Sequence, residues 1–451
     1  MTIDQPPRTG PVEPSEIATA ARELPLAALP SGKPPRRGKR FDLNTFESLN
    51  DHQFRWFFVS LMGHFTAMNM QLFIRGWMVF QLTGSYALLG GITLATAIPQ
   101  ILFSLPGGVL ADLMPQKKWV VQVGQSVNAI NSFAIAALVI SGDIEVFHLM
   151  AAAVVQGTAM SLTLPARQAM TPEIVGPVRL MNATALSTAG MNTARLVMPG
   201  LAGWLVAAVG GGGGVEGAQW VYLFMGAMYL MAIAFLFPVS TPHAPRSDSP
   251  RTMRGARADV VDGLRYIRGN RDVSLVLAVN LLLEVVAMPY FFLLPGFVND
   301  VLDGGALEVG TLLSISGIGS LAGSLLIASL PNRRRAAVMM WSSVVMGIAL
   351  LAFSASTMFW VSAFFFIVVG FGQTARFAVA SVLIQAYTVD GYRGRVSSVY
   401  TLSWGLTSFG TFGVGLLADK VGAQIAFGST AVAVLIVAGM LMRWTRINQL
   451  D

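Results

Sequence analysis

Apolar stretches of helical length follow one another along most of the chain and are separated by short polar connectors. A helix needs about 20 residues to cross a hydrocarbon core of about 30 Å. Glycine and proline inside such stretches are compatible with helices, because neighbouring membrane helices satisfy the freed backbone groups. The pattern predicts an all-α membrane protein with twelve transmembrane helices, at 54–80, 86–112, 118–140, 146–172, 180–208, 219–240, 273–299, 308–330, 336–354, 358–388, 396–418 and 424–442.

The twelve predicted helices divide into two pseudo-symmetric halves of six. Short matches recur at a shift of about 216 residues, such as Pro115–Lys118 with Pro331–Arg334 and Gly107 with Gly323. Two parallel halves around a central cavity are a known transporter plan. The predicted organisation is an N-terminal tail (1–45), a six-helix half (46–240), a linker (241–272), a second six-helix half (273–443) and a C-terminal tail (444–451).

Two segments outside the predicted spans differ in composition. The N-terminal tail has eight prolines and the basic run Lys33–Arg40. It offers too little apolar surface to fold alone, so we predict that it is disordered. In the linker, Val260, Leu264 and Ile267 share one helical face that arginines flank. This pattern predicts an amphipathic helix on the inner membrane surface, and a solvated linker helix fits it equally well.

Charge is scarce, and its distribution predicts the orientation. Only 12% of the residues are charged, about half the usual fraction of a soluble domain. Of the 30 lysines and arginines, 25 fall on one side of the predicted membrane, four lie inside spans and only Lys420 lies on the other side. Positive charge marks the cytoplasmic side, so both termini are predicted to be cytoplasmic in a multi-pass protein of a bacterial inner membrane.

Several function classes lack their sequence signatures. The basic residues form no stripe interleaved with aromatic residues, so nucleic-acid binding is not predicted despite the net charge of +7. There is no cysteine, and the four histidines form no cluster with metal-ligand spacing. There is also no phosphate-binding loop that would indicate ATP-driven transport. We therefore expect no cofactor, no metal and no enzyme activity.

The connector after the second predicted span resembles a known signature. The segment 108–118 matches the motif between the second and third spans of the major facilitator superfamily. In that family a glycine permits close helix packing, and an aspartate and basic residues form a cytoplasmic latch. Here Leu113 and Pro115 replace the usual basic residue and glycine. The resemblance implies a latch made of Gly108, Asp112, Lys117, Lys118, Arg333, Arg334 and Arg335.

Further motifs resemble one branch of that superfamily. They are Leu82–Ser85, Pro165–Arg167, Leu180–Ala183, Asn192–Arg195 and Arg393–Arg395. They are similar to the enterobactin-exporter-like branch, also described as drug–proton antiporters and transmembrane secretion effectors, over roughly residues 43–440. The resemblance implies proton-driven export of small, often amphipathic compounds by a fold that is usually complete in one chain.

Polar side chains recur at helical spacing in four spans, and in the facilitator plan these four spans line the central cavity. On the first span His64, Met68, Gln71 and Arg75 share one face. The fourth, seventh and tenth spans carry similar sets, and aromatic and methionine residues follow on the seventh. The predicted cavity residues are Met68, Gln71, Arg75, Gln156, Met160, Thr163, Asn280, Met288, Phe291, Gln373 and Arg376.

Glu284 is the only carboxylate deep inside a predicted span. Intramembrane ionisable residues are costly and are functional candidates by default. One hypothesis is that Glu284 is the proton-coupling site and pairs in one state with Arg376 or Arg75. The alternative is a permanent ion pair that only holds helices together. His64 could relay protons, or be a hydrogen-bonded packing residue, and the related family often has an acidic residue at this position.

Two other arginines lie within predicted spans, and Asn192 lies near one of them. Arg167 is close enough to the cytoplasmic end to snorkel, and Glu173 or Asp112 is its predicted partner. Arg195 lies in mid-span, where it either contacts an anion or belongs to a fixed polar core. We favour the second reading and assign Arg167, Asn192 and Arg195 to a structural polar core.

The sequence thus predicts a secondary transporter that works by alternating access. Its expected partners are a small-molecule substrate, protons and the lipid bilayer, and the functional unit is expected to be a monomer. The leading hypothesis is a proton-coupled exporter of amphipathic molecules such as drugs or siderophores. An importer or uniporter on the same fold and a non-transport sensor or assembly factor are the alternatives.

Overall fold

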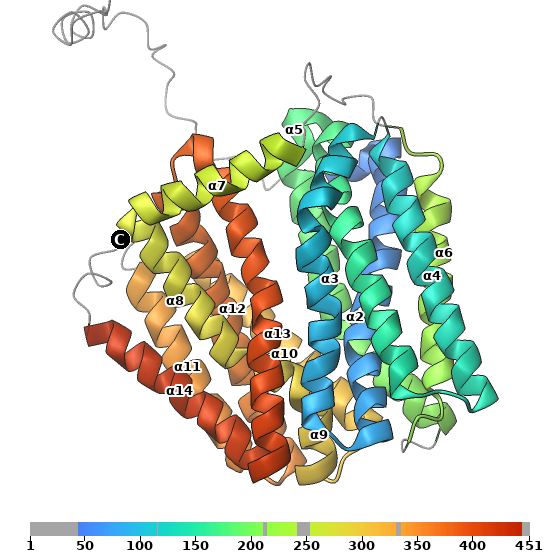
Figure 1. Cartoon of the computed structure of the whole chain (residues 1–451), viewed down its shortest axis with the longest axis vertical. Coiled ribbons are helices and arrows are strands. Elements are labelled where there is room, and N and C mark those ends of the chain that lie inside the picture. Colours follow the sequence, from blue (N-terminus) through green and yellow to red (C-terminus); the bar gives the residue numbers. More distant parts are fainter. Residues whose placement is uncertain (1–43, 115, 211–213, 241–252, 331–334, 444–451) are drawn as a thin grey trace, which may run out of the picture. The chain divides into compact units, whose positions relative to one another are not determined.

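The computed structural model describes residues 44–114, 116–210, 214–240, 253–330 and 335–443. The predicted N-terminal tail, apart from its last two residues, and the C-terminal tail lie outside these ranges. The first half contains η1 (Asn44–Asn50), α2 (His52–Thr83), α3 (Tyr86–Leu113), α4 (Lys117–Ser141), α5 (Val146–Gly210) and α6 (Ala218–Leu236). The rest contains α7 (Met253–Gly269), α8 (Arg271–Ala287), α9 (Pro289–Val301), α10 (Ala306–Ser329), α11 (Arg335–Ala355), α12 (Phe359–Tyr387), η2 (Asp390–Tyr392), α13 (Arg393–Val421) and α14 (Ala423–Arg443) (Figure 1).

Polar residues mark where the long helices begin and end. The Asp51 carboxylate accepts hydrogen bonds from the backbone N–H groups of Gln53 and Phe54, at 2.9 and 3.3 Å, which caps the start of α2. Helix α2 ends at Gly84, whose φ of 61° is left-handed. Ser85 then caps α3 through a bond from the N–H of Leu88. The connection between these two spans is therefore very short.

The fourth and fifth predicted spans both lie in α5, which runs from Val146 to Gly210. The two parts meet at Gly176, where φ is 66° and ψ is 176°. Glycine adopts this backbone conformation without the steric cost that a side chain would add. Pro177 follows and donates no backbone hydrogen bond. The two predicted helices are thus joined by a sharp kink instead of a loop (Figure 1).

The seventh predicted span, 273–299, is not one helix. It consists of α8 and α9, which meet at Met288. Pro289 opens α9 and has no N–H to donate to the carbonyl of Val285, four residues earlier. A β-carbon added to Gly410 of α13 would lie 2.3 Å from that carbonyl oxygen, so α13 packs directly against the interrupted turn.

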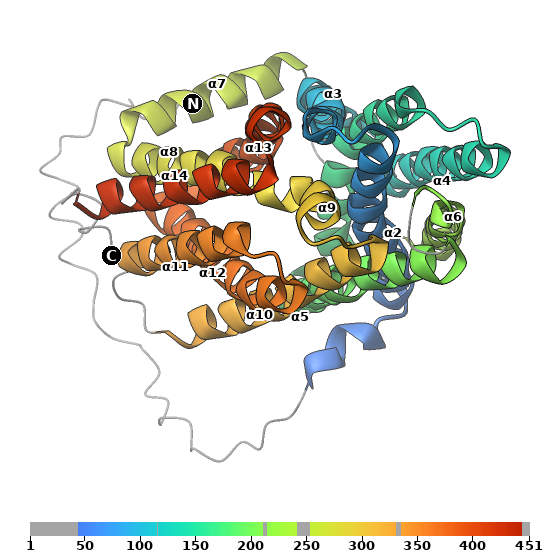
Figure 2. The same ribbon diagram turned by 90° about the horizontal axis from the view of Figure 1, so that it is seen from below.

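The two halves repeat the same close helix contacts. A β-carbon on Gly107 of α3 would lie 2.4 Å from the carbonyl oxygen of Ser161 on α5. A β-carbon on its predicted counterpart, Gly323 of α10, would lie 2.6 Å from the carbonyl oxygen of Phe371 on α12. In Figure 2, α2, α3, α4 and α6 lie together on one side, and α8, α11, α12 and α14 on the other.

Length and composition agree with a membrane protein. In the described part of the chain, ten helical stretches are long and apolar enough to cross a membrane. One of them is α5, which holds two predicted spans, and one combines α8 and α9. Helix α13 is outside this set, although it occupies the eleventh predicted span. The predicted all-helical fold of twelve spans is confirmed.

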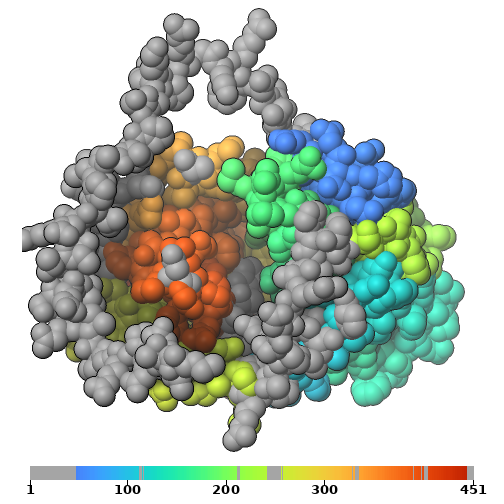
Figure 3. Space-filling model, turned by 90° about the horizontal axis from the view of Figure 1, so that it is seen from above, coloured from blue at the N-terminus to red at the C-terminus, as the bar shows by residue number. Residues whose placement is uncertain are grey.

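Hydrogen bonds between the halves gather at one end of the bundle, which we call the Ser85 end. There the Asp419 carboxylate of α13 accepts bonds from Ser85 Oγ (2.8 Å) and from the N–H groups of Tyr86 (2.7 Å) and Ala87 (3.0 Å). The Tyr86 hydroxyl also donates to Asp300, at 2.9 Å. The opposite end, along which α7 lies, is the α7 end. Seen from it, the surface recedes between the orange second half and the green part of α5 (Figure 3).

Candidate functional site

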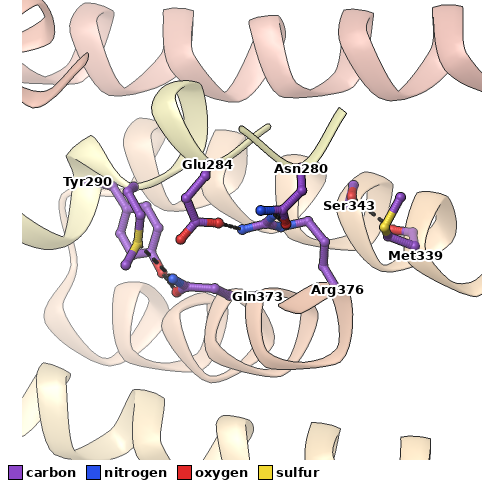
Figure 4. A network of polar contacts seen from close by, with 8 residues as sticks. Asn280, Glu284, Tyr290, Met339, Ser343, Gln373 and Arg376 are labelled. Carbon is purple, nitrogen blue, oxygen red and sulfur yellow. Dashed lines mark hydrogen bonds and ion pairs between the residues drawn. The ribbon is translucent and has the colours of Figure 1, made fainter. Parts of the chain in front are cut away.

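The second half contains a buried ion pair between α8 and α12. Arg376 donates to the carboxylate of Glu284, and both side chains are almost completely buried, at 1% and 2% exposure. Arg376 also donates to the Asn280 side-chain oxygen, at 3.3 Å (Figure 4). Asn280 and Glu284 are one helical turn apart, so both reach the same guanidinium. Of the two partners predicted for Glu284, Arg376 is the one in contact.

Three further side chains lie beside this ion pair: Met288 and Tyr290 at the break between α8 and α9, and Gln373 on α12. The Tyr290 hydroxyl donates to the amide oxygen of Gln373. The Gln373 amide nitrogen donates to the sulfur of Met288, at 2.8 Å (Figure 4). Gln373 lies one turn before Arg376 on α12. Four of the five predicted cavity residues of the seventh and tenth spans therefore lie together in buried polar contacts: Asn280, Met288, Gln373 and Arg376.

The first half contains a second polar network, centred on Arg75 of α2. Its guanidinium donates to Thr96 of α3, at 3.0 Å, and to Gln156 of α5. Gln156 in turn donates to Gln71, which also accepts a bond from the Tyr229 hydroxyl at 3.2 Å. Among the described residues, the hydrogen-bond partners of Arg75 are neutral side chains, Tyr222 of α6 included. Arg75 is 8% exposed, so its charge is held away from bulk water with no carboxylate partner in this part of the chain.

A third polar group surrounds His64 in the first half. The His64 ring nitrogen lies 3.2 Å from the Gln125 amide nitrogen of α4. Arg167 interacts electrostatically with this histidine. Both terminal nitrogens of Arg167 are buried without a hydrogen-bond partner among the described residues, and so is the Gln125 side-chain oxygen. The predicted partnership of Arg167 with Glu173 is wrong, because Glu173 forms an ion pair with Lys117.

The remaining residues of the predicted site occupy different settings. Met68, Met160 and Phe291 are half-buried. Thr163 is buried against Gly124 of α4 and donates to the carbonyl of Ala159, at 3.0 Å. Packing between α4 and α5 therefore explains Thr163 without a role in a cavity.

Arg195 differs from the other intramembrane arginines. It is half-buried on α5 and lies within electrostatic reach of Tyr290 in the second half. Among the described residues it has no hydrogen bond or ion pair. Asn192, one turn earlier, is also half-buried. The structural polar core to which the sequence assigned these residues stays a prediction.

The predicted latch is only partly within the described residues. The Lys118 ammonium donates to the carbonyls of Val239 and Phe237, at 2.9 and 3.3 Å, near the end of α6. A β-carbon on Gly108 would meet open space, so the closely packed glycine of this motif is Gly107. Arg335 begins α11 and is half-buried. The side chain of Asp112, and Arg333 and Arg334, lie outside the described part of the chain.

Several residues of these networks were not predicted from the sequence. Thr96 of α3 and Tyr229 of α6 are among them, and only the packing of these helices against α2 and α5 brings Thr96 to Arg75 and Tyr229 to Gln71. Gln122, Gln125 and Asn128 do repeat every third residue on α4. That spacing was a usable signal of a polar helix face.

Comparison with known proteins identifies the family. A family model described as transmembrane secretion effector matches residues 43–451. The chain belongs to this family. The multidrug efflux pump Tap of Mycolicibacterium fortuitum is 23% identical over 383 residues, which cover 83% of this chain and 91% of that protein. The staphyloferrin A transporter of Staphylococcus aureus (strain NCTC 8325 / PS 47) is 21% identical over 365 residues, which cover 80% and 88%.

A solved structure shows the same fold as this transmembrane secretion effector. A bacterial homologue of the iron transporter ferroportin, in an inward-facing state, superposes with a TM-score of 0.69 at 16% identity and covers 87% of this chain and 98% of its own. The major facilitator fold, the family and the prediction of a transporter instead of an enzyme are confirmed. In the described residues, no group of three or more side chains could hold a metal ion.

Proposed function

We propose that this transmembrane secretion effector is a proton-coupled exporter of small amphipathic molecules in a bacterial inner membrane. The observation that carries the proposal is the buried Glu284–Arg376 pair between α8 and α12. Glu284 is the one carboxylate in the middle of the described spans, and a proton on it would remove the attraction that holds Arg376. The efflux pump among the relatives supports export.

The distribution of positive charge supports an orientation. The α7 end carries Lys117, Lys118, Arg179 and the arginines of α7, so we assign it to the cytoplasm. The Ser85 end then faces outward. Because most of the hydrogen bonds between the halves lie at the Ser85 end, we take the described conformation to be closed to the outside.

The proposed cycle follows from the cost of a buried charge. Removing one partner of a buried ion pair costs about 3–5 kcal/mol, because the other charge is left unpaired. Protonation of Glu284 from outside therefore leaves Arg376 to find another partner or water. Such a change between α8 and α12 would bias the two halves toward a different conformation. Substrate would be released outward in the same step, and proton release to the cytoplasm would reset the pair.

Two alternatives make different demands on the same residues. An importer or uniporter would keep the fold without needing a titrating carboxylate. A permanent ion pair would hold α8 and α12 together in every state. In both cases Glu284 would contribute to stability or binding and would not set the dependence of transport on the proton gradient.

The test is accumulation of fluorescent amphipathic dyes in a bacterial host that lacks its own pumps, with and without a protonophore. We expect wild type to lower accumulation, and both the protonophore and Glu284→Gln to abolish this effect. Asp143→Asn is the control, because it neutralises an exposed carboxylate between α4 and α5, and it should leave efflux as in wild type. Efflux that remains protonophore-sensitive in Glu284→Gln would exclude Glu284 as the coupling site.

A further inference from the structure

We infer that the substrate carries negative charge, and that Arg195 and Arg75 are its binding residues. The inference rests on the proposed transport function and adds the substrate class, an amphipathic organic anion such as a carboxylate. It also replaces the structural role that the sequence favoured for Arg195.

The charge balance in the middle of the helices is strongly positive. Arg75, Arg195 and Arg376 lie there, Arg167 lies closer to the α7 end, and Glu284 is the only carboxylate among the described residues at mid-span depth. Glu284 is already paired with Arg376. The other three guanidiniums have no carboxylate partner among the described residues. A low-dielectric site lined by one sign of charge concentrates ligands of the opposite sign and repels ligands of the same sign.

Arg195 lies where the two halves meet. Its neighbour Leu196 packs against Gly317 of α10, and Ser314 of α10 accepts a bond from the N–H of Gly200, at 3.0 Å. Arg195 is only half-buried and lies near Tyr290 of the second half. A guanidinium at this depth is costly without a partner. Its partial exposure and free donors make an anionic ligand between the halves a suitable partner.

Arg75 is fixed in position but not neutralised. Thr96 and Gln156 hold its guanidinium from two different helices. The next residue, Gly76, packs against Pro295 of α9, so this part of α2 also faces the second half. A planar guanidinium that is held in place by neutral groups can bind a carboxylate with little loss of side-chain freedom. Backbone contacts thus bring the segments of α2 and α5 that carry Arg75 and Arg195 to the junction of the halves.

The experiment measures binding to the purified full-length protein in phosphatidylcholine nanodiscs, without any ion gradient. The probes are carboxyfluorescein, which is anionic, and rhodamine 123, a cation on the same ring frame. Fluorescence anisotropy reports the Kd of each dye. We expect wild type to bind carboxyfluorescein at least about tenfold more tightly than rhodamine 123, which corresponds to a preference of about 1.4 kcal/mol.

Variants separate a binding role from a structural role. We expect Arg195→Gln and Arg75→Gln each to weaken carboxyfluorescein binding about tenfold or more. Arg195→Lys, which keeps the charge, should recover part of the affinity. Arg179→Gln is the matched control, because it removes an exposed arginine near the α7 end that pairs with Asp51. It should leave binding unchanged.

The outcomes decide the inference separately from the proposed function. Equal binding of the two dyes, tighter binding of rhodamine 123, or no carboxyfluorescein binding would overturn it. Displacement of the anionic dye by phosphatidylglycerol in the discs would assign the arginines to a lipid headgroup and overturn it as well. Anion binding that depends on Arg195 would uphold the inference even if the dye-accumulation test showed no export. Protonophore-sensitive export of cations alone would uphold export and refute the anionic substrate.

Discussion

Asp419 is expected to hold the two halves together at the Ser85 end. Its carboxylate accepts three hydrogen bonds at the start of α3, two of them from backbone N–H groups. The first turn of a helix has unpaired N–H groups and partial positive charge, so a carboxylate there is favourable. Because Asp419 belongs to α13, this interaction exists only while the halves are in contact at this end.

The free energy that the Asp419 hydrogen bonds contribute to closure depends on how exposed they are to water. A hydrogen bond to a charged group contributes about 1.5–3 kcal/mol when it is well shielded. Asp419 is exposed, and water would replace its partners after opening, so the three bonds together should contribute about 1–2 kcal/mol. Replacing Asp419 by alanine should therefore raise the ratio of open to closed molecules at this end by about 5–30-fold.

The chain is well suited to a distance measurement, because it contains no cysteine. Cysteines introduced for Glu216 and Met358 would place spin labels on opposite halves at the Ser85 end. Both positions are exposed. Pulsed electron spin resonance would then give the distribution of distances between the labels. In Asp419→Ala we expect the long-distance population to grow at the expense of the short one.

Lys420→Ala is the control, since it removes the adjacent exposed charge. It should leave the distance distribution as in wild type. An unchanged distribution in Asp419→Ala, or an equal shift in both variants, would refute the reasoning. Closure at this end would then depend on the apolar contacts, such as that of Gly90 with Phe412.

Two other predictions concern packing and the linker helix. Gly107→Ala should lower stability by about 1–3 kcal/mol, because its β-carbon would overlap Ser161. Gly108→Ala should be neutral, and equal melting temperatures of the two variants would contradict this. Arg395 donates to Asp262 and to Asp259, the latter at 2.6 Å. Arg395→Ala should therefore speed hydrogen exchange in α7 but not in α2, and unchanged exchange in α7 would contradict the tethering role.

The sequence predicted the helices well because hydropathy and length are properties of single segments. It did not predict the interruption at Met288. Proline occurs inside several spans here, including Pro99 of α3 and Pro199 of α5, without ending the helix. Whether a proline breaks a membrane helix depends on what satisfies the freed carbonyl. At Pro289 the backbone of α13 at Gly410 packs against the freed carbonyl of Val285, and Gly410 lies more than a hundred residues away in sequence.

The candidate site was predictable only in part for the same reason. Helical spacing placed Asn280 and Glu284 on one face and Gln373 and Arg376 on another, and these faces meet in the structure. Spacing could not choose between Arg376 and Arg75 as the partner of Glu284. It also could not show that Glu173 forms its ion pair with Lys117 and not with Arg167. Such choices depend on the distance between helices, which no single segment encodes.

Charge places a condition on how the two proposals fit together. A proton on Glu284 frees Arg376, which adds positive charge to a region where three other guanidiniums have no carboxylate partner in the described part of the chain. More positive charge should strengthen anion binding, and a proton and a substrate that favour each other's binding are typical of cotransport in one direction. Export by exchange requires the opposite relation. Arg376, once freed, would then have to turn away from the substrate.

Glu284→Gln imitates the protonated state. Its effect on dye binding therefore shows whether protonation of Glu284 strengthens or weakens anion binding. Weaker carboxyfluorescein binding than in wild type would agree with exchange of a proton for an exported anion. Tighter binding would favour the importer on the same fold, and equal binding would mean that Glu284 and the anion site are energetically independent. In that last case the membrane potential alone could still drive an anion outward, since the cell interior is negative.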